Sequence, residues 1–210
     1  MKKYLFLFMI LSMQGIFAIS IELSAFSGSS ITVNWDTFPD GTTVGHRVAI
    51  TNQYQSWGIL LSSPETGDPL SISAASDAFS DPNLLAPPGL YSGTIVIEFV
   101  DPTTGLRSPY FTTLRAGTKI DPTCGGTSVT LKAYDYYGNL LGTDVGTQGT
   151  FIGIESTQRI SYVSINGPNY TIDDFIYEPF SLGMVLPEMT TFLYSLLALS
   201  ILFFVQWKKN

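Results

Sequence analysis

Cysteine, histidine and charged residues are scarce in this sequence. Its 210 residues include one cysteine, Cys124, and one histidine, His46. A single thiol excludes an internal disulfide framework and any zinc site built from several cysteines. Charged side chains make up only 13% of the chain, about half the usual share, and the net charge is −7. Because binding to nucleic acid needs clusters of lysine and arginine, this balance argues against a nucleic-acid partner.

Recognisable catalytic motifs are also missing. A serine hydrolase would need His46 as its base, but no nucleophile-elbow sequence accompanies it, so a turn or surface histidine is the simpler interpretation. Cys124 lies in the turn-like segment 122–126, without neighbours that mark it as a nucleophile. No glycine-rich phosphate loop follows a strand and opens a helix. We therefore expect a protein that is not an enzyme.

Apolar residues, glycine and proline are plentiful. Apolar residues make up 45% of the chain, and 19 glycines and 12 prolines favour short strands joined by tight turns. The strands that alternation of apolar and polar residues predicts are 91–100, 128–134, 151–154, 160–165 and 172–177. We expect an all-β domain over residues 19–180, an antiparallel β-sandwich of the jelly-roll type. Its segment 62–88 is expected to be a long connection with at most short strands.

The first residues, 1–18, have the layout of a secretory signal peptide. Two lysines precede an apolar run from Tyr4 to Met13, and Ala18 is a small residue at the exit. A positive flank, about ten apolar residues and a small residue before the cut are typical of such peptides. We expect cleavage after Ala18. An uncleaved anchor helix is the alternative, although ten residues are short for a bilayer, which takes about twenty.

The other end of the chain predicts a single transmembrane helix. Residues 190–207 contain no acidic or basic side chain, and at 1.5 Å per residue they reach roughly 27 Å, enough for the hydrocarbon core. The basic tail, 208–210, is expected to stay in the cytoplasm and the domain outside it. A core helix docked on the domain is the alternative. In the linker 181–189, Pro187 and Glu188 suit the first turn of a helix.

This ending resembles the PEP-CTERM sorting signal of Gram-negative bacteria, in which a Pro-Glu motif precedes a transmembrane helix and a basic tail. Pro187 and Glu188 occupy the motif, Met189 stands where the family has a second proline, and the tail has lysine in place of arginine. The resemblance implies recognition by an exosortase, which is a processing enzyme, and association with exopolysaccharide. A plain membrane-entry turn without processing is the alternative.

The domain is similar to secreted galactose-binding-like jelly-roll domains that carry the same tail. The segments that bear this likeness are 35–41, 52–59, 129–135, 138–142, 151–154 and 172–175. The likeness implies a sandwich fold but no defined activity.

Two adjacent carboxylates, Asp173 and Asp174, are the most distinctive polar feature of the domain. Neighbours in a strand point to opposite faces, so one of them should share a face with apolar residues, and a buried carboxylate needs a partner or a metal. In galactose-binding-like carbohydrate modules an aspartate of the last strand supports a structural calcium ion, which the resemblance implies here. Asp36 and Asp40 are further candidate donors if the first and last strands are neighbours. Alternatively, one aspartate accepts backbone hydrogen bonds and the other is solvated.

Aromatic rings at the surface are candidates for glycan binding, because flat rings stack on the apolar faces of sugars. The ligand-binding candidates are Tyr54, Tyr136 and Tyr137, with Trp57 and Tyr134 as further members of the set. Tyr136 and Tyr137 lie near a turn, where their rings can face solvent.

These features together predict an exported, non-enzymatic bacterial protein of the cell surface or extracellular matrix. Its sandwich would stand outside the membrane on the C-terminal helix and associate with glycans. Two other classes stay open. A secreted glycan-active enzyme would need a cleft with convergent carboxylates of shifted pKa. A structural protein would assemble through its sheet edges.

Overall fold

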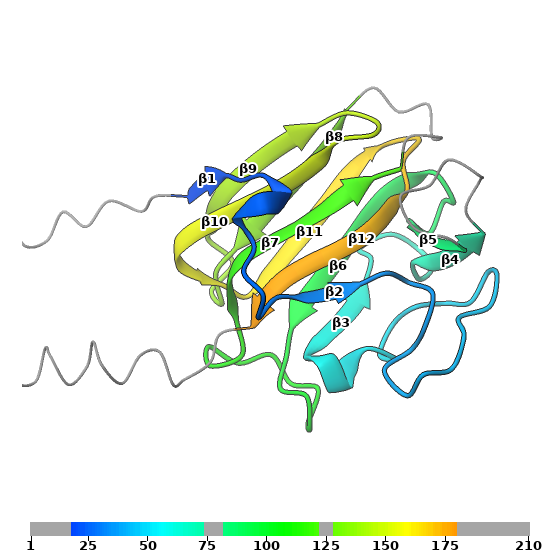
Figure 1. Ribbon diagram of the computed structural model, residues 1–210, viewed down its shortest axis with the longest axis horizontal. Coiled ribbons are helices and arrows are strands. Elements are labelled where there is room, and N and C mark those ends of the chain that lie inside the picture. Colours follow the sequence, from blue (N-terminus) through cyan, green and yellow to red (C-terminus); the bar gives the residue numbers. More distant parts are fainter. Residues whose placement is uncertain (1–17, 74–81, 122–127, 180–210) are drawn as a thin grey trace, which may run out of the picture. The chain divides into compact units, whose positions relative to one another are not determined.

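The computed structural model describes residues 18–73, 82–121 and 128–179, which form a sandwich of two antiparallel sheets (Figure 1). Within these residues the larger sheet has seven strands: β1 (Ala18–Ser20), β2 (Ile31–Val33), β4 (Leu70–Ser73), β5 (Asn83–Ala86), β7 (Thr113–Ile120), β10 (Phe151–Ile160) and β12 (Ile172–Pro179). The smaller sheet has five: β3 (Ile59–Ser62), β6 (Ser92–Phe99), β8 (Val129–Tyr134), β9 (Leu140–Gly146) and β11 (Tyr162–Pro168). Two short 3₁₀ turns complete it: η1 (Leu23–Ala25) and η2 (Gln55–Trp57).

The strand order brings an early strand, β2, beside the last strand, β12. The larger sheet has the order β1-β10-β7-β12-β5-β4, and β2 also pairs with β12. The smaller sheet has the order β3-β6-β11-β8-β9. The expected all-β antiparallel sandwich is therefore confirmed. The five expected strands correspond to β6, β8, β10, β11 and β12 with differences at their ends, and the described part of the connection 62–88 contains the short strands β4 and β5.

The features predicted for the two ends of the chain fall largely outside the described residues. Beyond the description lie residues 1–17 of the expected signal peptide, Cys124, the Pro187-Glu188 motif and the expected helix 190–207. Ala18, the expected cleavage residue, is the first residue of β1. Within the described ranges, no helix is both long and apolar enough to cross a bilayer.

The core fills the space between the two sheets. Ile95, Ile97 and Phe99 of β6 are buried on one face, as their alternation predicts. Phe175 and Tyr177 of β12 meet them from the facing sheet, with the ring centroids of Phe99 and Tyr177 5.3 Å apart. These aromatic contacts hold the central strands of the two sheets against each other.

The two adjacent aspartates of β12 lie at a β-bulge. Ile172 pairs with Ile120 and Phe175 with Thr118, so β12 uses three steps where β7 uses two. The extra residue shifts the alternation, and both Ile172 and Phe175 reach the core. Asp173 and Asp174 are consequently both buried, which corrects the expectation that one of the pair could be solvated.

Strand β7 is built from small residues because a ring covers its outer face. Gly117 pairs with Gly153 of β10, and Phe151 lies over both glycines. A Cβ atom on Gly117 would lie 2.3 Å from Cζ of Phe151 and 2.8 Å from the carbonyl oxygen of Ile152. The Phe151 ring meets Phe26 edge to face, with centroids 5.9 Å apart. The missing side chain at position 117 thus lets the segment before β2 pack on the sheet.

We expect Gly117→Ala to lower the free energy of unfolding by about 1 to 3 kcal/mol, because the new methyl group overpacks a site that backbone and ring already fill. Urea unfolding followed by circular dichroism measures this change. Gly28→Ala is the matched control, since a Cβ there has nothing within 4 Å. Equal stability of the two variants would contradict the packing described for Phe151.

Candidate functional site

Aromatic and charged side chains gather on the outer face of the smaller sheet. Tyr162 of β11 is paired with Tyr134 of β8 on one side and with Glu98 of β6 on the other. Because Val163 and Ile165 point into the core, these three side chains share the solvent face. The rings of Tyr134 and Tyr162 are stacked, with centroids 4.7 Å apart and planes 7° from parallel.

An arginine from the β6–β7 loop joins the two tyrosines to the carboxylate. The guanidinium carbon of Arg107 lies 5.2 Å from the ring centroid of Tyr162 and 5.6 Å from that of Tyr136. Its Nη1 atom donates to Glu98 Oε1 at 3.2 Å. Such contacts combine a cation–π attraction with an ion pair. Burial, followed by the neighbouring Tyr134, raises the pKa of Tyr162, so its hydroxyl stays protonated at neutral pH.

The turn after β8 presents the most exposed ring of this group. The Asp135 carboxylate accepts hydrogen bonds from the backbone N–H groups of Tyr137 (2.9 Å) and Asn139 (2.8 Å) and from the Asn139 side chain (2.8 Å). Burial acts to raise the pKa of Asp135, but these bonds outweigh it and lower that pKa. Gly138 takes the left-handed conformation that the turn needs, with φ +87°. The ring of Tyr137 is held on this turn with 83% of its surface exposed.

We call this surface the tyrosine patch; its members are Tyr134, Tyr136, Tyr137, Tyr162, Arg107 and Glu98. It offers an exposed flat ring, a guanidinium donor and a carboxylate acceptor side by side. Sequence analysis selected Tyr136 and Tyr137, and the structure brings them together with Tyr134 of the same candidate set. It missed Tyr162, Arg107 and Glu98, because only the register of β11 with its two neighbours brings these residues together.

The prediction that Tyr54 binds a ligand is wrong, because its side chain is not accessible. Its ring is fully buried and packs edge to face on Trp35, with centroids 5.6 Å apart. Its hydroxyl donates to the carbonyl oxygen of Thr37 at 3.1 Å. Trp57 is half-buried against the core, and its carbonyl oxygen accepts a hydrogen bond from Tyr177. Both rings are thus part of the core of the sandwich.

The candidate calcium donors are bound to protein groups. Asp174 Oδ2 lies 2.6 Å from Lys119 Nζ, and Asp36 Oδ1 accepts the backbone N–H of Asn83 at 2.8 Å. Asp40 Oδ1 accepts two hydrogen bonds from Thr42 in an exposed turn. β2 does lie beside β12, which was the condition for Asp36 and Asp40 to approach Asp173.

Within ranges 18–73, 82–121 and 128–179, no three side chains of the acidic, histidine or cysteine type are grouped to hold a metal ion. The calcium ion stays a prediction from the resemblance.

A pocket lies at the opposite end of the sandwich from the tyrosine patch, between the start of the domain and the β9–β10 hairpin. Its volume is about 330 Å³, and Ile21, Phe151 and Asp144 are among its lining residues. Asp144 accepts hydrogen bonds from the Ser20 hydroxyl (2.8 Å) and from two backbone N–H groups, so its carboxylate ties β1 to the hairpin. His46 lies exposed in a turn, as the simpler interpretation of this histidine predicts.

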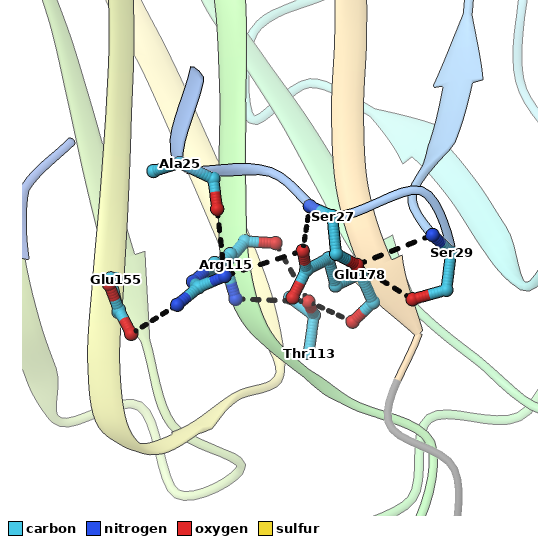
Figure 2. A network of polar contacts seen from close by, with 7 residues as sticks. All are labelled: Ala25, Ser27, Ser29, Thr113, Arg115, Glu155 and Glu178. Atoms are coloured by element: carbon cyan, nitrogen blue, oxygen red, sulfur yellow. Dashed lines mark hydrogen bonds and ion pairs between the residues drawn. The ribbon is translucent and has the colours of Figure 1, made fainter. Parts of the chain in front are cut away.

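A second polar cluster, centred on Arg115 of β7, joins four segments (Figure 2). Its guanidinium donates to Glu155 of β10 at 2.9 Å, to the Ala25 carbonyl oxygen at 2.8 Å and to Glu178 of β12 at 3.5 Å. Glu178 also accepts the backbone N–H of Ser27 at 2.6 Å. We call this cluster the Arg115 clasp. Each of its charges has an opposite charge beside it, so its role is to hold the strand ends together.

Stability should depend on the protonation of Glu178. Partial burial acts to raise the pKa of Glu178, but the hydrogen bonds from Ser27 and the charge of Arg115 outweigh it and lower that pKa below its ordinary value. A carboxyl with a lowered folded-state pKa adds stability above its unfolded-state pKa, and this stability is lost as the pH falls through the folded-state value. The contribution should therefore be complete at neutral pH and disappear in acid.

We expect Glu178→Gln to cost on the order of 1 kcal/mol at pH 7, because a neutral amide loses the ion pair but keeps an acceptor. The gap to the wild type should begin to shrink as the pH falls below the ordinary pKa of glutamate, and it should close below the lowered folded-state pKa, where the wild-type side chain is neutral too. Urea unfolding across a pH series measures it, with the exposed Glu22→Gln as control. A gap that stays constant into acid would refute this assignment.

Comparisons with known proteins give a fold likeness only. No protein-family model and no curated protein matches the sequence. Among solved structures, the chain is similar to part of a GH26-CBM35 β-(1,4)-mannanase from Podospora anserina, with 8% identity and a TM-score of 0.33 over 74% of this chain and 28% of that one. It is also similar to the enzymatically active domain of tailspike protein 4 of bacteriophage CBA120, with 14% identity and a TM-score of 0.28 over 70% of this chain and 22% of that one. The chain spans less than a third of either structure, and these TM-scores support no assignment of function.

Proposed function

We propose that this chain is an exported bacterial surface or matrix protein that binds glycans through the tyrosine patch and has no catalytic role. The observation that carries this proposal is Tyr137, a ring with 83% of its surface exposed on a turn that Asp135 fixes in place. A turn whose backbone is fixed before binding loses little conformational entropy when a sugar stacks on its ring. Tyr136 contacts the Tyr137 ring, and Arg107 over Tyr136 and its partner Glu98 offer a donor and an acceptor for sugar hydroxyl groups.

The proposal places the domain outside the cytoplasm on the strength of the two chain ends. The signal-peptide layout of residues 1–18 supports export, and the apolar stretch 190–207 supports a membrane anchor. The resemblance of Pro187, Glu188 and the basic tail to a PEP-CTERM signal supports an exosortase as the processing partner. Exopolysaccharide is then the glycan that an anchored domain would meet first.

Loss of the exposed ring should weaken glycan binding. For Tyr137→Ala in the full chain, held in detergent micelles, we expect roughly fivefold weaker retardation in gels that contain a bound polysaccharide, equivalent to about 1 kcal/mol. The polysaccharides tested are a neutral glucan, a mannan and a uronate-rich polymer. Tyr91→Ala, which removes a ring 47% exposed, is the matched control. If both variants migrate like the wild type in each polysaccharide that retards it, the patch is not the binding surface.

The C-terminal segment should decide membrane retention. A chain that ends before Pro187 should be released from the membrane fraction, because it lacks the only stretch after the domain with enough apolar length to span a bilayer. Fractionation of the native host measures this, and mass spectrometry of the mature protein locates its C-terminus. An end near Pro187 supports processing, whereas unchanged retention of the shortened chain rules out the anchor.

A further inference from the structure

Exposed apolar side chains follow one another along the β6–β7 loop and the start of β7. Leu106 and Tyr110 of the β6–β7 loop have 68% and 62% of their surface exposed, and Phe111 and Leu114 follow with 37% each. We call these four residues the β6–β7 tip. Neighbouring apolar groups that remain in water at such exposure are typical of a surface that another molecule or a membrane covers.

The tip lies where the described chain ends. Thr113, at the start of β7, is paired with Pro179, the last described residue of β12. The Thr113 hydroxyl also bonds to the carbonyl oxygen of Glu178. Figure 1 shows the β6–β7 loop, in green, projecting from the end of the sandwich at which β12 finishes. The Arg115 clasp fixes this arrangement, since Arg115 and Glu178 join the two strands one residue further in.

The length of chain that follows brings this end close to the expected membrane helix. Residues 180–189 separate Pro179 from the expected helix at 190–207. When fully extended, these ten residues span at most about 33 to 36 Å, which limits how far the expected helix can lie from the end of β12. The chain leaves the domain toward that helix at the end of the sandwich that carries the tip.

The chemistry of the tip matches a lipid interface. Tyrosine, with an apolar ring and a polar hydroxyl, is enriched at the level of the headgroups, and Leu and Phe suit the layer below. Arginines stand around it: Arg107 and Arg115 lie on either side in the sequence, and Arg159 donates to the carbonyl oxygen of Pro109 at 3.0 Å. Arg107 is paired with Glu98, and Arg115 with Glu155 and Glu178, so the apolar side chains rather than net charge favour contact with lipid here.

We propose that the β6–β7 tip docks on the surface of the bilayer beside the anchor helix and thereby fixes the orientation of the domain. This inference depends on the membrane anchor of the proposed function. Docking leaves the pocket beside the β9–β10 hairpin at the end remote from the lipid. The tyrosine patch includes Arg107, the neighbour of Leu106 in the chain, and so lies next to the docked end.

The test uses the full chain in vesicles of phosphatidylcholine and phosphatidylglycerol, so dilute in protein that vesicles hold single chains. In a Cys124→Ser background, Tyr110→Cys and Tyr91→Cys each carry an environment-sensitive fluorophore. The two positions have similar exposure and lie at opposite ends of the sandwich. Lipids with a nitroxide at the headgroup quench any fluorophore that contacts the interface. We expect at least twofold stronger quenching at position 110 than at position 91.

Each outcome distinguishes the docking from the anchor. Alkaline carbonate extraction of the same vesicles shows whether the chain is anchored, and release of the chain would contradict the anchor and the docking together. Retention with equal quenching at both positions would contradict the docking alone. Quenching at position 110 that appears only when vesicles contain several chains would mean that contact between copies, rather than docking by a single chain, brings the tip to the lipid, and would overturn the proposal. Glycan retardation by the Tyr110→Cys variant should stay at the wild-type level, because Tyr110 is outside the tyrosine patch.

Discussion

The pairing of β7 with β12 is the interaction on which the rest of the structure depends. β12 lies between β7 and β5 and also receives β2, so it joins the beginning, middle and end of the domain in one sheet. Its partner β7 carries Arg115. The Arg115 clasp joins η1 and β10 to Glu178, near the end of β12. Strand order, the chain exit and the position of the β6–β7 tip all follow from this one pair.

The sequence predicts those strands in which apolar and polar side chains alternate. It does not predict strands in which packing requires a different pattern. β6 and β8 have one face in the core and one in water, so their periodicity is plain. β7 was not predicted, because its outer face needs glycine beneath the Phe151 ring and its inner face carries Ala116 and Thr118 in place of large apolar residues. The large side chains around β7 belong to the segments on both sides of it, so the sequence of β7 itself lacks the usual alternation of large apolar and polar residues.

The residues of the candidate site also differ in whether local sequence predicts them. Tyr136 and Tyr137 follow from local sequence, since a turn can expose its own residues. Tyr162, Arg107 and Glu98 depend on cross-strand register, which local sequence does not specify. Tyr54 was wrongly predicted to be exposed. A tyrosine that follows a polar segment can face either water or the core, and the local sequence does not distinguish the two. The two aspartates of β12 were expected on opposite faces, and a single extra residue in the strand buried both.

The proposed anchor would pull on the domain through β12, the last described strand. The first bonds to bear such a pull are those of Thr113 and the Arg115 clasp. The clasp connects β12 to β7, β10 and the segment before β2. Such a pull would therefore be shared among four segments and would not separate a single strand from the edge of the sheet. The Asp135 turn is on the other sheet, so its geometry does not depend on the loaded strand. The proposed binding surface and the proposed anchor thus belong to different sheets, so a pull on β12 would leave the turn that carries Tyr137 unchanged.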